Sequence, residues 1–169
     1  MNYATDGVWH KHLLAVIAER MKPHCFLELG LGGDPAVGYV AQHADVSYGV
    51  DRYHDAALAK TYRNTMLIRA TTDEFFEGIG KIIEPPDLVL IDADHDKDQV
   101  LKDLRGVAAI CAPNCLVAIH DTFPEGDHHT RPELCSNSYQ VPAELDCEHV
   151  TLPFPPGVTL CRLRPQSLV

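Results

Sequence analysis

The chain has 169 residues, of which 46% are hydrophobic, and a formal net charge of −10 with its histidines neutral. A chain of this length can bury one core, so we expect a single domain over residues 1–169. Its acidic excess repels nucleic-acid phosphates, so we expect a small-molecule partner and no nucleic acid. No apolar stretch approaches ~20 residues and no basic-then-apolar leader is present, so we expect no membrane association and a cytoplasmic location.

Hydrophobic periodicity predicts helices and strands that alternate along the chain. Apolar residues spaced mainly four positions apart between Trp9 and Met21 predict an amphipathic helix that Pro23 ends. Further helices are predicted from about Pro35 and at 55–62, 72–83 and 100–111, and strands at 25–29, 46–50, 66–69, 88–91 and 116–119. This alternation is typical of a parallel sheet with right-handed crossovers. Apolar runs at 150–152 and 158–163 predict a closing hairpin.

A polar segment rich in Gly, Pro and His covers residues 121–142. It is too long for a simple connector, so we expect a lid or substrate loop that is more mobile than the sheet and orders when substrate binds. Its His128 and His129 are expected to be solvated, although either could join a second metal site.

The six cysteines do not have the spacing of a zinc ribbon. Three of them, Cys25, Cys115 and Cys161, fall within predicted strands or, for Cys115, at the start of one. We therefore expect small buried hydrophobic side chains rather than ligands.

A glycine-rich turn follows the first predicted strand, with Gly30 and Gly32 positioned to let backbone approach a ligand closely. A dinucleotide-binding fingerprint would have a third glycine where Pro35 stands. Asp51 ends the second predicted strand some twenty residues later, where a carboxylate can hold ribose hydroxyls. Together these features predict a cofactor that carries a nucleoside.

This order of motifs resembles the class I S-adenosylmethionine-dependent methyltransferases over nearly the whole chain. The resemblance implies an α/β fold, with a Rossmann-like, doubly wound, mostly parallel seven-stranded sheet closed by an antiparallel C-terminal hairpin. It also implies S-adenosylmethionine as the cofactor, with Glu28, Gly30 and Gly32 at its methionine side and Asp51 at its ribose. The remaining residues expected near the cofactor are Arg52, Thr71, Thr72 and Asp92, with Tyr53 either stacking on adenine or lying at the surface.

Two further motifs resemble the metal-dependent O-methyltransferases. Asp92 and His95 match an Asp-x-x-His pattern at the fourth strand end, and His120-Asp121 stands where these relatives place two adjacent metal ligands. The resemblance implies that Asp92, His120 and Asp121 hold a divalent cation such as Mg²⁺ or Mn²⁺, and that His95 is the catalytic base. His120 replaces the usual acid, which shifts the preference from Mg²⁺ toward Mn²⁺, Fe²⁺ or Zn²⁺.

The predicted chemistry is methylation of a small hydroxylated acceptor. A hydroxyl attacks a sulfonium methyl group poorly unless it loses its proton. A cation lowers the pKa of that hydroxyl, and a histidine can accept the proton at neutral pH. The acceptor itself has no signature, so its selectivity would come from the 121–142 segment, the N-terminal helix or a second subunit in a homodimer.

Other interpretations remain open at this point. The chain could be a metal-independent methyltransferase or an inactive cofactor-binding relative, and Asp92, Asp94 or Asp96 could serve only to cap a helix. The residues available to a two-metal hydrolase are Asp92, Asp94, His95, His120, Asp121 and His128. A hydrolase leaves the glycine turn and Asp51 without a role, and an NAD oxidoreductase is disfavoured by the missing third glycine.

Overall fold

The computed structural model describes residues 8–53 and 64–164, so the helix predicted at 55–62 lies outside the described residues. The described part contains a seven-stranded sheet in the order β3-β2-β1-β4-β5-β7-β6. The first five of these strands are parallel, whereas β7 runs antiparallel to β5 and β6 antiparallel to β7. The strands are β1 (Cys25–Leu29), β2 (Val46–Asp51), β3 (Thr65–Arg69), β4 (Leu88–Ile91), β5 (Cys115–His120), β6 (His149–Leu152) and β7 (Val158–Leu163).

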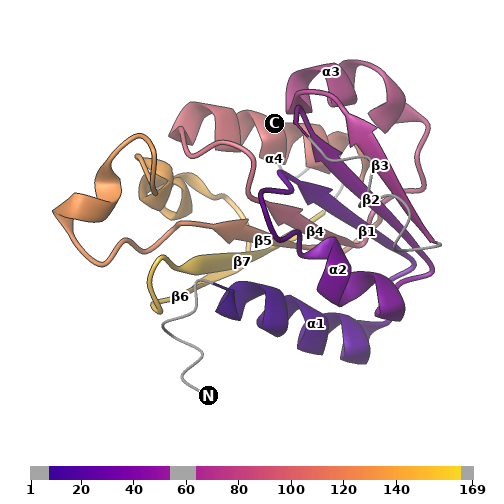
Figure 1. Ribbon diagram of the computed structural model, residues 1–169, viewed down its shortest axis with the longest axis horizontal. Coiled ribbons are helices and arrows are strands. Elements are labelled where there is room, and N and C mark those ends of the chain that lie inside the picture. The colour runs from indigo at the N-terminus through magenta and orange to yellow at the C-terminus, as the bar shows by residue number, and fades with distance from the viewer. Residues whose placement is uncertain (1–7, 54–63, 165–169) are drawn as a thin grey trace.

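Helices cover both faces of the sheet. The helices α1 (Trp9–Met21) and α2 (Val37–Val40) lie on one face, and α3 (Thr72–Glu77) and α4 (Lys97–Ile110) lie on the other (Figure 1). Short 3₁₀ turns are η1 (Ala41–His43), η3 (Ile79–Lys81), η4 (Asp127–Thr130) and η5 (Ser138–Glu144). The predicted doubly wound sheet with its antiparallel closing hairpin is confirmed.

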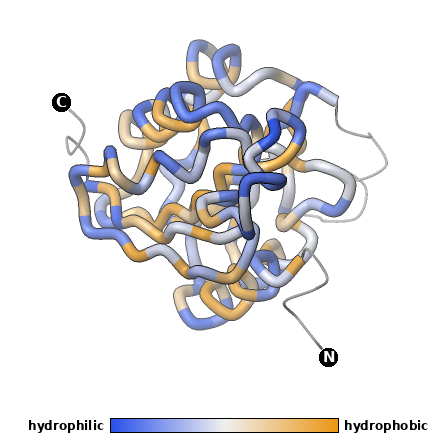
Figure 2. Tube along the Cα trace, turned by 90° about the vertical axis from the view of Figure 1, so that its left-hand side faces the viewer, coloured by the Kyte–Doolittle hydropathy of each residue, from blue (hydrophilic) through white to orange (hydrophobic). Residues whose placement is uncertain are grey.

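The core consists of two apolar layers separated by the sheet. All five residues of β1 are buried, and Phe26 packs in the layer that contains Leu14 of α1. Its neighbour Leu27 faces the opposite layer, which contains Leu104 of α4. Burying each such side chain contributes about 1.5–3 kcal/mol. Figure 2 shows hydrophobic residues along the central strands, so the strand ends are held on a packed framework.

Two predicted helices are shorter in the structure. The helix predicted at 72–83 ends at Glu77, because Gly78 leaves helical geometry (φ −115°, ψ −107°) and only η3 follows. Its start is fixed by a capping box between Thr71 and Glu74. The helix predicted from Pro35 is a single turn that continues as η1.

The segment 121–142 is better anchored than its polar composition predicts. It contains η4 and most of η5, and Cys135, Ser138 and Val141 are buried within it. In Figure 1 it is the orange part of the chain beyond the end of β5. The cysteines predicted within strands lie in β1, β5 and β7, and all three are buried. No helix among the described residues is long and apolar enough to cross a membrane.

Candidate active site

A cavity of about 230 Å³ opens at the carboxyl ends of β1 to β4. Parallel strands present these ends to one edge, which is where open α/β sheets bind ligands. The predicted cofactor residues that line it are Gly30, Asp51, Arg52, Thr71 and Thr72, and the other lining residues are Val50, Ala70, Asp73, Ala93, Asp94 and Gln99. Five of the predicted cofactor residues therefore share one cavity.

Gly30 joins this cavity to the end of β4. Its φ of +88° lies in the left-handed region, and a Cβ at this position would collide with the backbone of Asp92 and Ala93. Only glycine combines that conformation with so close an approach. The turn after β1 therefore rests directly on the turn after β4.

Asp51 holds two of the loops that border the cavity. One carboxylate oxygen accepts a hydrogen bond from Leu31 N at 2.9 Å, and the other accepts from Tyr53 N at 2.7 Å. A carboxylate offers about four lone-pair positions, so both oxygens can still accept from a ligand. The Tyr53 side chain is 80% exposed and does not line the cavity, which favours the interpretation of Tyr53 as a surface residue over a role in stacking on adenine.

Glu28 and Gly32 support the glycine turn rather than line the described cavity. Glu28 is buried and accepts hydrogen bonds from Ala36 N at 2.7 Å and Val37 N at 2.6 Å, at the start of α2. Burial raises its pKa to about 8, although these two hydrogen bonds oppose the shift. Gly32 has a left-handed φ of +54°.

Gln99 is a lining residue that no sequence motif indicated. Its amide nitrogen donates to Thr72 Oγ1 at 3.1 Å and to Asp103 Oδ1 at 3.0 Å, so it connects α4 to the start of α3. It lies in the first turn of α4, where Asp96 is the N-cap and accepts from Asp98 N and Gln99 N. The capping interpretation is thus confirmed for Asp96, and Asp92 is not the cap of α4.

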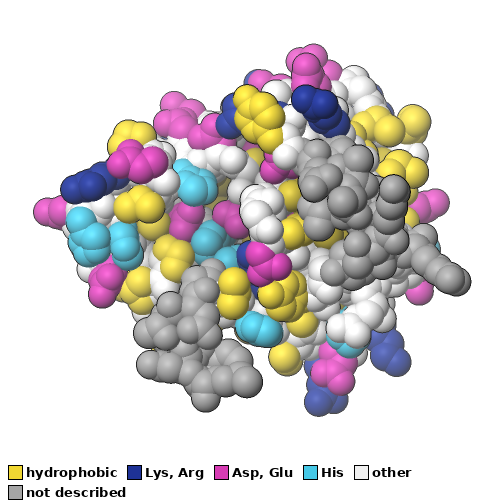
Figure 3. Space-filling view, viewed as in Figure 1, with side chains coloured by type: hydrophobic (Ala, Val, Ile, Leu, Met, Phe, Trp, Pro, Cys, Tyr) yellow, Lys and Arg dark blue, Asp and Glu magenta, His cyan; other side chains and the backbone are white. Residues whose placement is uncertain are grey.

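The three predicted metal ligands meet beside the cavity. His120 Nδ1 lies 2.9 Å from Asp92 Oδ1 and 3.4 Å from Asp121 Oδ1. Asp92 follows β4 directly, whereas His120 ends β5 and Asp121 comes next. Figure 3 shows histidine and acidic side chains gathered on this face, near the ends of the parallel strands.

His95 lies against the same carboxylates. Its Nδ1 contacts the carbonyl oxygen of Leu134, and its Nε2 lies 3.1 Å from Asp121 Oδ2 and 3.9 Å from Asp92 Oδ1. A carbonyl only accepts hydrogen bonds, so Leu134 favours the tautomer that carries the proton on Nδ1. Nε2 faces the Asp121 carboxylate, which also only accepts hydrogen bonds, so a proton taken up on Nε2 would have a partner there.

Asp121 is fixed by the segment that follows it. Its φ of 59° is left-handed, a conformation that aspartate tolerates better than most residues. Ser138 Oγ donates to the Asp121 carbonyl at 2.7 Å, and Cys135 Sγ donates to Asp121 Oδ1 at 3.5 Å. Burial and the nearby carboxylate raise the pKa of Cys135 to about 12, so its thiol keeps the proton that it donates.

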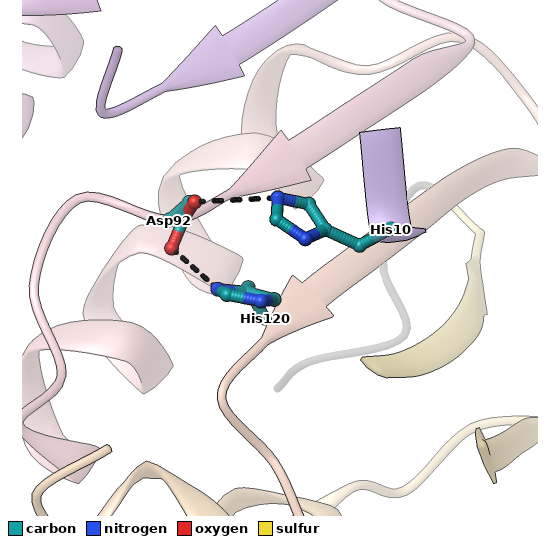
Figure 4. A group of neighbouring side chains, drawn as sticks. All are labelled: His10, Asp92 and His120. Atoms are coloured by element: carbon teal, nitrogen blue, oxygen red, sulfur yellow. Dashed lines mark hydrogen bonds and ion pairs between the residues drawn. The ribbon is translucent and has the colours of Figure 1, made fainter. Parts of the chain in front are cut away.

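One member of the cluster, His10, lies outside the strand-end motifs and was not predicted from the sequence. It points from α1 toward Asp92, with Nε2 3.9 Å from Asp92 Oδ2, and its ring centroid lies 3.9 Å from that of His120 (Figure 4). Its signal in the sequence was its position four residues before Leu14 and eight before Ala18, on the buried face of α1. Burial lowers the pKa of His10 to about 3, so the ring is neutral.

The charges of the cluster depend on one another. Burial by itself would raise the pKa of Asp92, but attraction to His120 and the hydrogen bond between them outweigh it and leave the pKa lowered. Burial likewise acts to lower the pKa of His120, but attraction to Asp92 and the hydrogen bond with it outweigh burial and leave the pKa of His120 raised. A positive charge is therefore stabilised at the carboxylates of this cluster.

The donor atoms fit a divalent cation. Asp92 belongs to two groups whose ligand atoms lie within 4.8 Å of one another, one with His10 and His120 and one with His95 and Asp121. The predicted set of Asp92, His120 and Asp121 is therefore divided between these two groups. Carboxylate oxygens and imidazole nitrogens suit Zn²⁺, Fe²⁺ or Mn²⁺. His128 and His129 form a separate group with Glu125 in the 121–142 segment, and this group is mostly exposed.

Comparisons with known proteins agree with this arrangement. The model of a family described as a methyltransferase domain matches residues 27–122. No curated protein matches the chain. Because the family model covers more than half of the chain, the match establishes the family and not the fold alone.

Solved structures share the fold at low sequence identity. An O-methyltransferase, TomG from Streptomyces achromogenes, in complex with S-adenosylmethionine, has a TM-score of 0.71 at 14% identity, covering 92% of this chain and 79% of that one. An O-methyltransferase from Bacillus cereus in complex with S-adenosylhomocysteine has a TM-score of 0.69 at 13% identity, covering 92% and 81%.

An N-methyltransferase, NodS from Bradyrhizobium japonicum, also has this fold, with a TM-score of 0.62 at 14% identity and coverage of 92% and 94%. The fold therefore does not fix the atom that receives the methyl group. With the family match, the strand order and the glycine turn followed by Asp51, the chain belongs to the class I S-adenosylmethionine-dependent methyltransferases.

Proposed function

We propose that the protein transfers a methyl group from S-adenosylmethionine to a hydroxyl oxygen of a small acceptor, with the help of a divalent cation. The observation that carries this proposal is that two half-sites, the cavity and the histidine and carboxylate cluster, are adjacent. Ala93 and Asp94 line the cavity, and Asp92, immediately before them, belongs to the histidine and carboxylate cluster. A methyl donor in the cavity would thus lie beside groups able to activate an acceptor.

The cavity is suited to the nucleoside end of the donor. Asp51 would accept hydrogen bonds from the ribose hydroxyls while it keeps its two backbone donors. Thr71 and Thr72 would lie beside the adenine, and Arg52 would border the same end. Glu28 would act indirectly, because it fixes the start of α2 behind the glycine turn.

The cluster is suited to holding the acceptor and removing its proton. Asp92, His120 and Asp121 would hold the cation, which when bound supplies a Lewis acid that lowers the pKa of the hydroxyl. His95 Nε2 would accept the proton, since Leu134 keeps the other nitrogen protonated. Asp121, 3.1 Å from Nε2, would stabilise the charged ring that results.

The proposal is tested by offering the protein isotopically labelled S-adenosylmethionine with a panel of hydroxylated small molecules, in the presence of Mg²⁺, Mn²⁺ or Zn²⁺. We expect label on an oxygen, loss of transfer in strong chelator, and a loss of roughly 10²- to 10⁴-fold in rate for His95→Gln. His128→Gln is the matched control, because His128 is exposed in η4. Full activity in chelator would contradict the role of the cation, and label on nitrogen or carbon would contradict O-methylation.

A further inference from the structure

We propose that His10 of α1 is itself a metal ligand, and that His10, Asp92 and His120 form a two-histidine, one-carboxylate site that selects a transition-metal ion over Mg²⁺. This inference rests on the proposed cation at the cluster. It goes further in two respects: it places His10 of the N-terminal helix, rather than Asp121, as the third ligand beside Asp92 and His120, and it names the class of metal.

The first observation is that a buried histidine lacks hydrogen-bond partners. His10 is 2% exposed, and among the described residues neither of its ring nitrogens has a hydrogen-bond partner. His120 Nδ1 lies 2.9 Å from Asp92 Oδ1, but His120 Nε2 has no hydrogen-bond partner among the described residues. Buried polar atoms nearly always have a hydrogen-bond partner, and leaving one without a partner destabilises the fold. Two such imidazoles side by side therefore require an explanation.

The second observation is the distance between His10 and Asp92. Their Nε2 and Oδ2 atoms lie 3.9 Å apart, which is too far for a hydrogen bond. Two ligands of one cation, each at ~2.0–2.2 Å from it, lie roughly 3–4 Å from each other. The ligand atoms of His10, Asp92 and His120 all lie within 4.8 Å of one another. Small side-chain shifts would bring all three onto one ion.

The third observation is that the fold holds His10 in this position. Leu14 and Ala18 lie on the same buried face of α1 and anchor it in the core. Trp9, next to His10, donates from Nε1 to the Pro155 carbonyl at 3.4 Å and packs edge-on against Phe154. The turn between β6 and β7 thus fixes the start of the helix. His10 therefore points at the end of β4 from a rigid element.

The chemistry of these donors determines the class of metal. Mg²⁺ prefers an octahedral shell of oxygen atoms, many of them from water. Imidazole nitrogen suits Zn²⁺, Fe²⁺ and Co²⁺, and a site with two imidazoles and one carboxylate supplies two such donors. His10 therefore adds affinity for transition metals without adding affinity for Mg²⁺.

The test compares metal binding by the wild-type chain, His10→Gln and the control His12→Gln, which changes an exposed histidine on the same helix. Each protein is freed of metal with chelator and then titrated with Co²⁺ and with Mg²⁺ by calorimetry, and the visible spectrum of Co²⁺ is recorded. We expect His10→Gln to weaken Co²⁺ binding by at least about tenfold, to change the Co²⁺ spectrum, and to leave Mg²⁺ binding unchanged. The control should behave as wild type.

Unchanged Co²⁺ affinity and spectrum in His10→Gln would overturn the inference, as would a wild-type chain that binds no Co²⁺. If His10→Gln does not fold, nitrogen NMR of the ¹⁵N-histidine wild-type chain titrated with Zn²⁺ decides the question. A shifted ring-nitrogen signal of His10 supports ligation, and an unshifted one refutes it. Methyl transfer is read separately, so full activity in chelator together with His10-dependent Co²⁺ binding would refute only the proposed catalytic role of the cation.

Discussion

At the scale of single residues, Gly30 connects the cavity to the cluster of histidine and carboxylate side chains. Its backbone lies against Asp92 and Ala93, so the position of the glycine turn and that of Asp92 depend on each other. The position requires glycine for two reasons: the turn has a positive φ, and the contact with Asp92 and Ala93 leaves no room for a Cβ atom. A change at Gly30 should therefore affect both half-sites together.

We predict that Gly30→Ala lowers the free energy of unfolding by about 2–4 kcal/mol and weakens both S-adenosylhomocysteine and Co²⁺ binding. The added methyl group must displace the backbone at the end of β4. Gly33→Ala is the control, because a Cβ there meets nothing within 4 Å. Urea unfolding and calorimetry measure both effects. Retention of Co²⁺ binding alongside weakened S-adenosylhomocysteine binding would show that the two half-sites are not coupled through Gly30.

Residue types and spacing predicted much of the site, but not all of it. Gly30 and Asp92 follow strands and Asp51 ends one, and parallel topology brings strand ends to one edge. His10 could not be predicted this way, because the pattern of apolar residues in a helix does not show which strand end the helix will cover in the fold. Nor could the sequence show that Glu28 binds backbone amides rather than lining the cavity, since that depends on where α2 begins.

At the scale of elements, α4 carries a buried carboxylate that links it to the cavity. Asp103 is completely buried, and its Oδ1 accepts from Gln99, whereas its Oδ2 has no hydrogen-bond partner among the described residues. Burial raises its pKa to about 6, although hydrogen bonds from Thr72 and Gln99 oppose the shift. The charged form of Asp103 therefore destabilises the folded chain.

We predict that Asp103→Asn raises the free energy of unfolding at pH 7.5 by up to about 3 kcal/mol. The pKa of Asp103 is about 6 in the folded chain and 3.8 in the unfolded chain. The neutral carboxyl group therefore stabilises the folded chain fully below pH 3.8, and this stabilisation is lost as the pH rises through about 6. The difference from wild type should thus shrink toward pH 4, as urea unfolding across this range would measure. Asp98→Asn, an exposed change on the same helix, should not stabilise the chain. A pH-independent difference would contradict the assignment.

The segment 121–142 should behave as two parts. The exposed stretch 123–133 should exchange its amide hydrogens faster than the sheet, whereas residues 135–141, which include buried Cys135, Ser138 and Val141, should be protected. Hydrogen exchange followed by mass spectrometry measures both stretches. Uniform protection across the whole segment would argue against a lid, and uniformly fast exchange would argue that it does not hold Asp121.

The elements that the sequence predicted best are those fixed by burial on both faces. All residues of β1 and β4 are buried because helices cover both sides of the sheet, and Glu28 is the only charged residue in these two strands. The lengths of α2 and α3 were predicted less well, because local backbone geometry at Gly78 and the continuation of α2 as η1 end these helices. Apolar spacing alone does not encode either feature.

At the scale of the whole molecule, one edge of the sheet carries all of the proposed chemistry. The strands β1 to β3 supply most of the cavity, and the ends of β4 and β5 supply most of the cluster. Helix α1 reaches this edge from one face of the sheet with His10 (Figure 4), while the segment after β5 brings Leu134, Cys135 and Ser138. Association into a homodimer remains a prediction, which analytical ultracentrifugation can test.

We infer that a methyl-donor cavity and a separate activating cluster lie side by side at this edge. Calorimetric titration of S-adenosylhomocysteine into the metal-free wild-type chain, Asp51→Ala and His95→Gln tests it most directly. We expect one molecule bound per wild-type chain, affinity lowered roughly 10- to 150-fold in Asp51→Ala, and unchanged affinity in His95→Gln, because Asp51 lines the cavity and His95 does not. No binding by the wild-type chain, or unchanged affinity in Asp51→Ala with a loss in His95→Gln, would contradict the account.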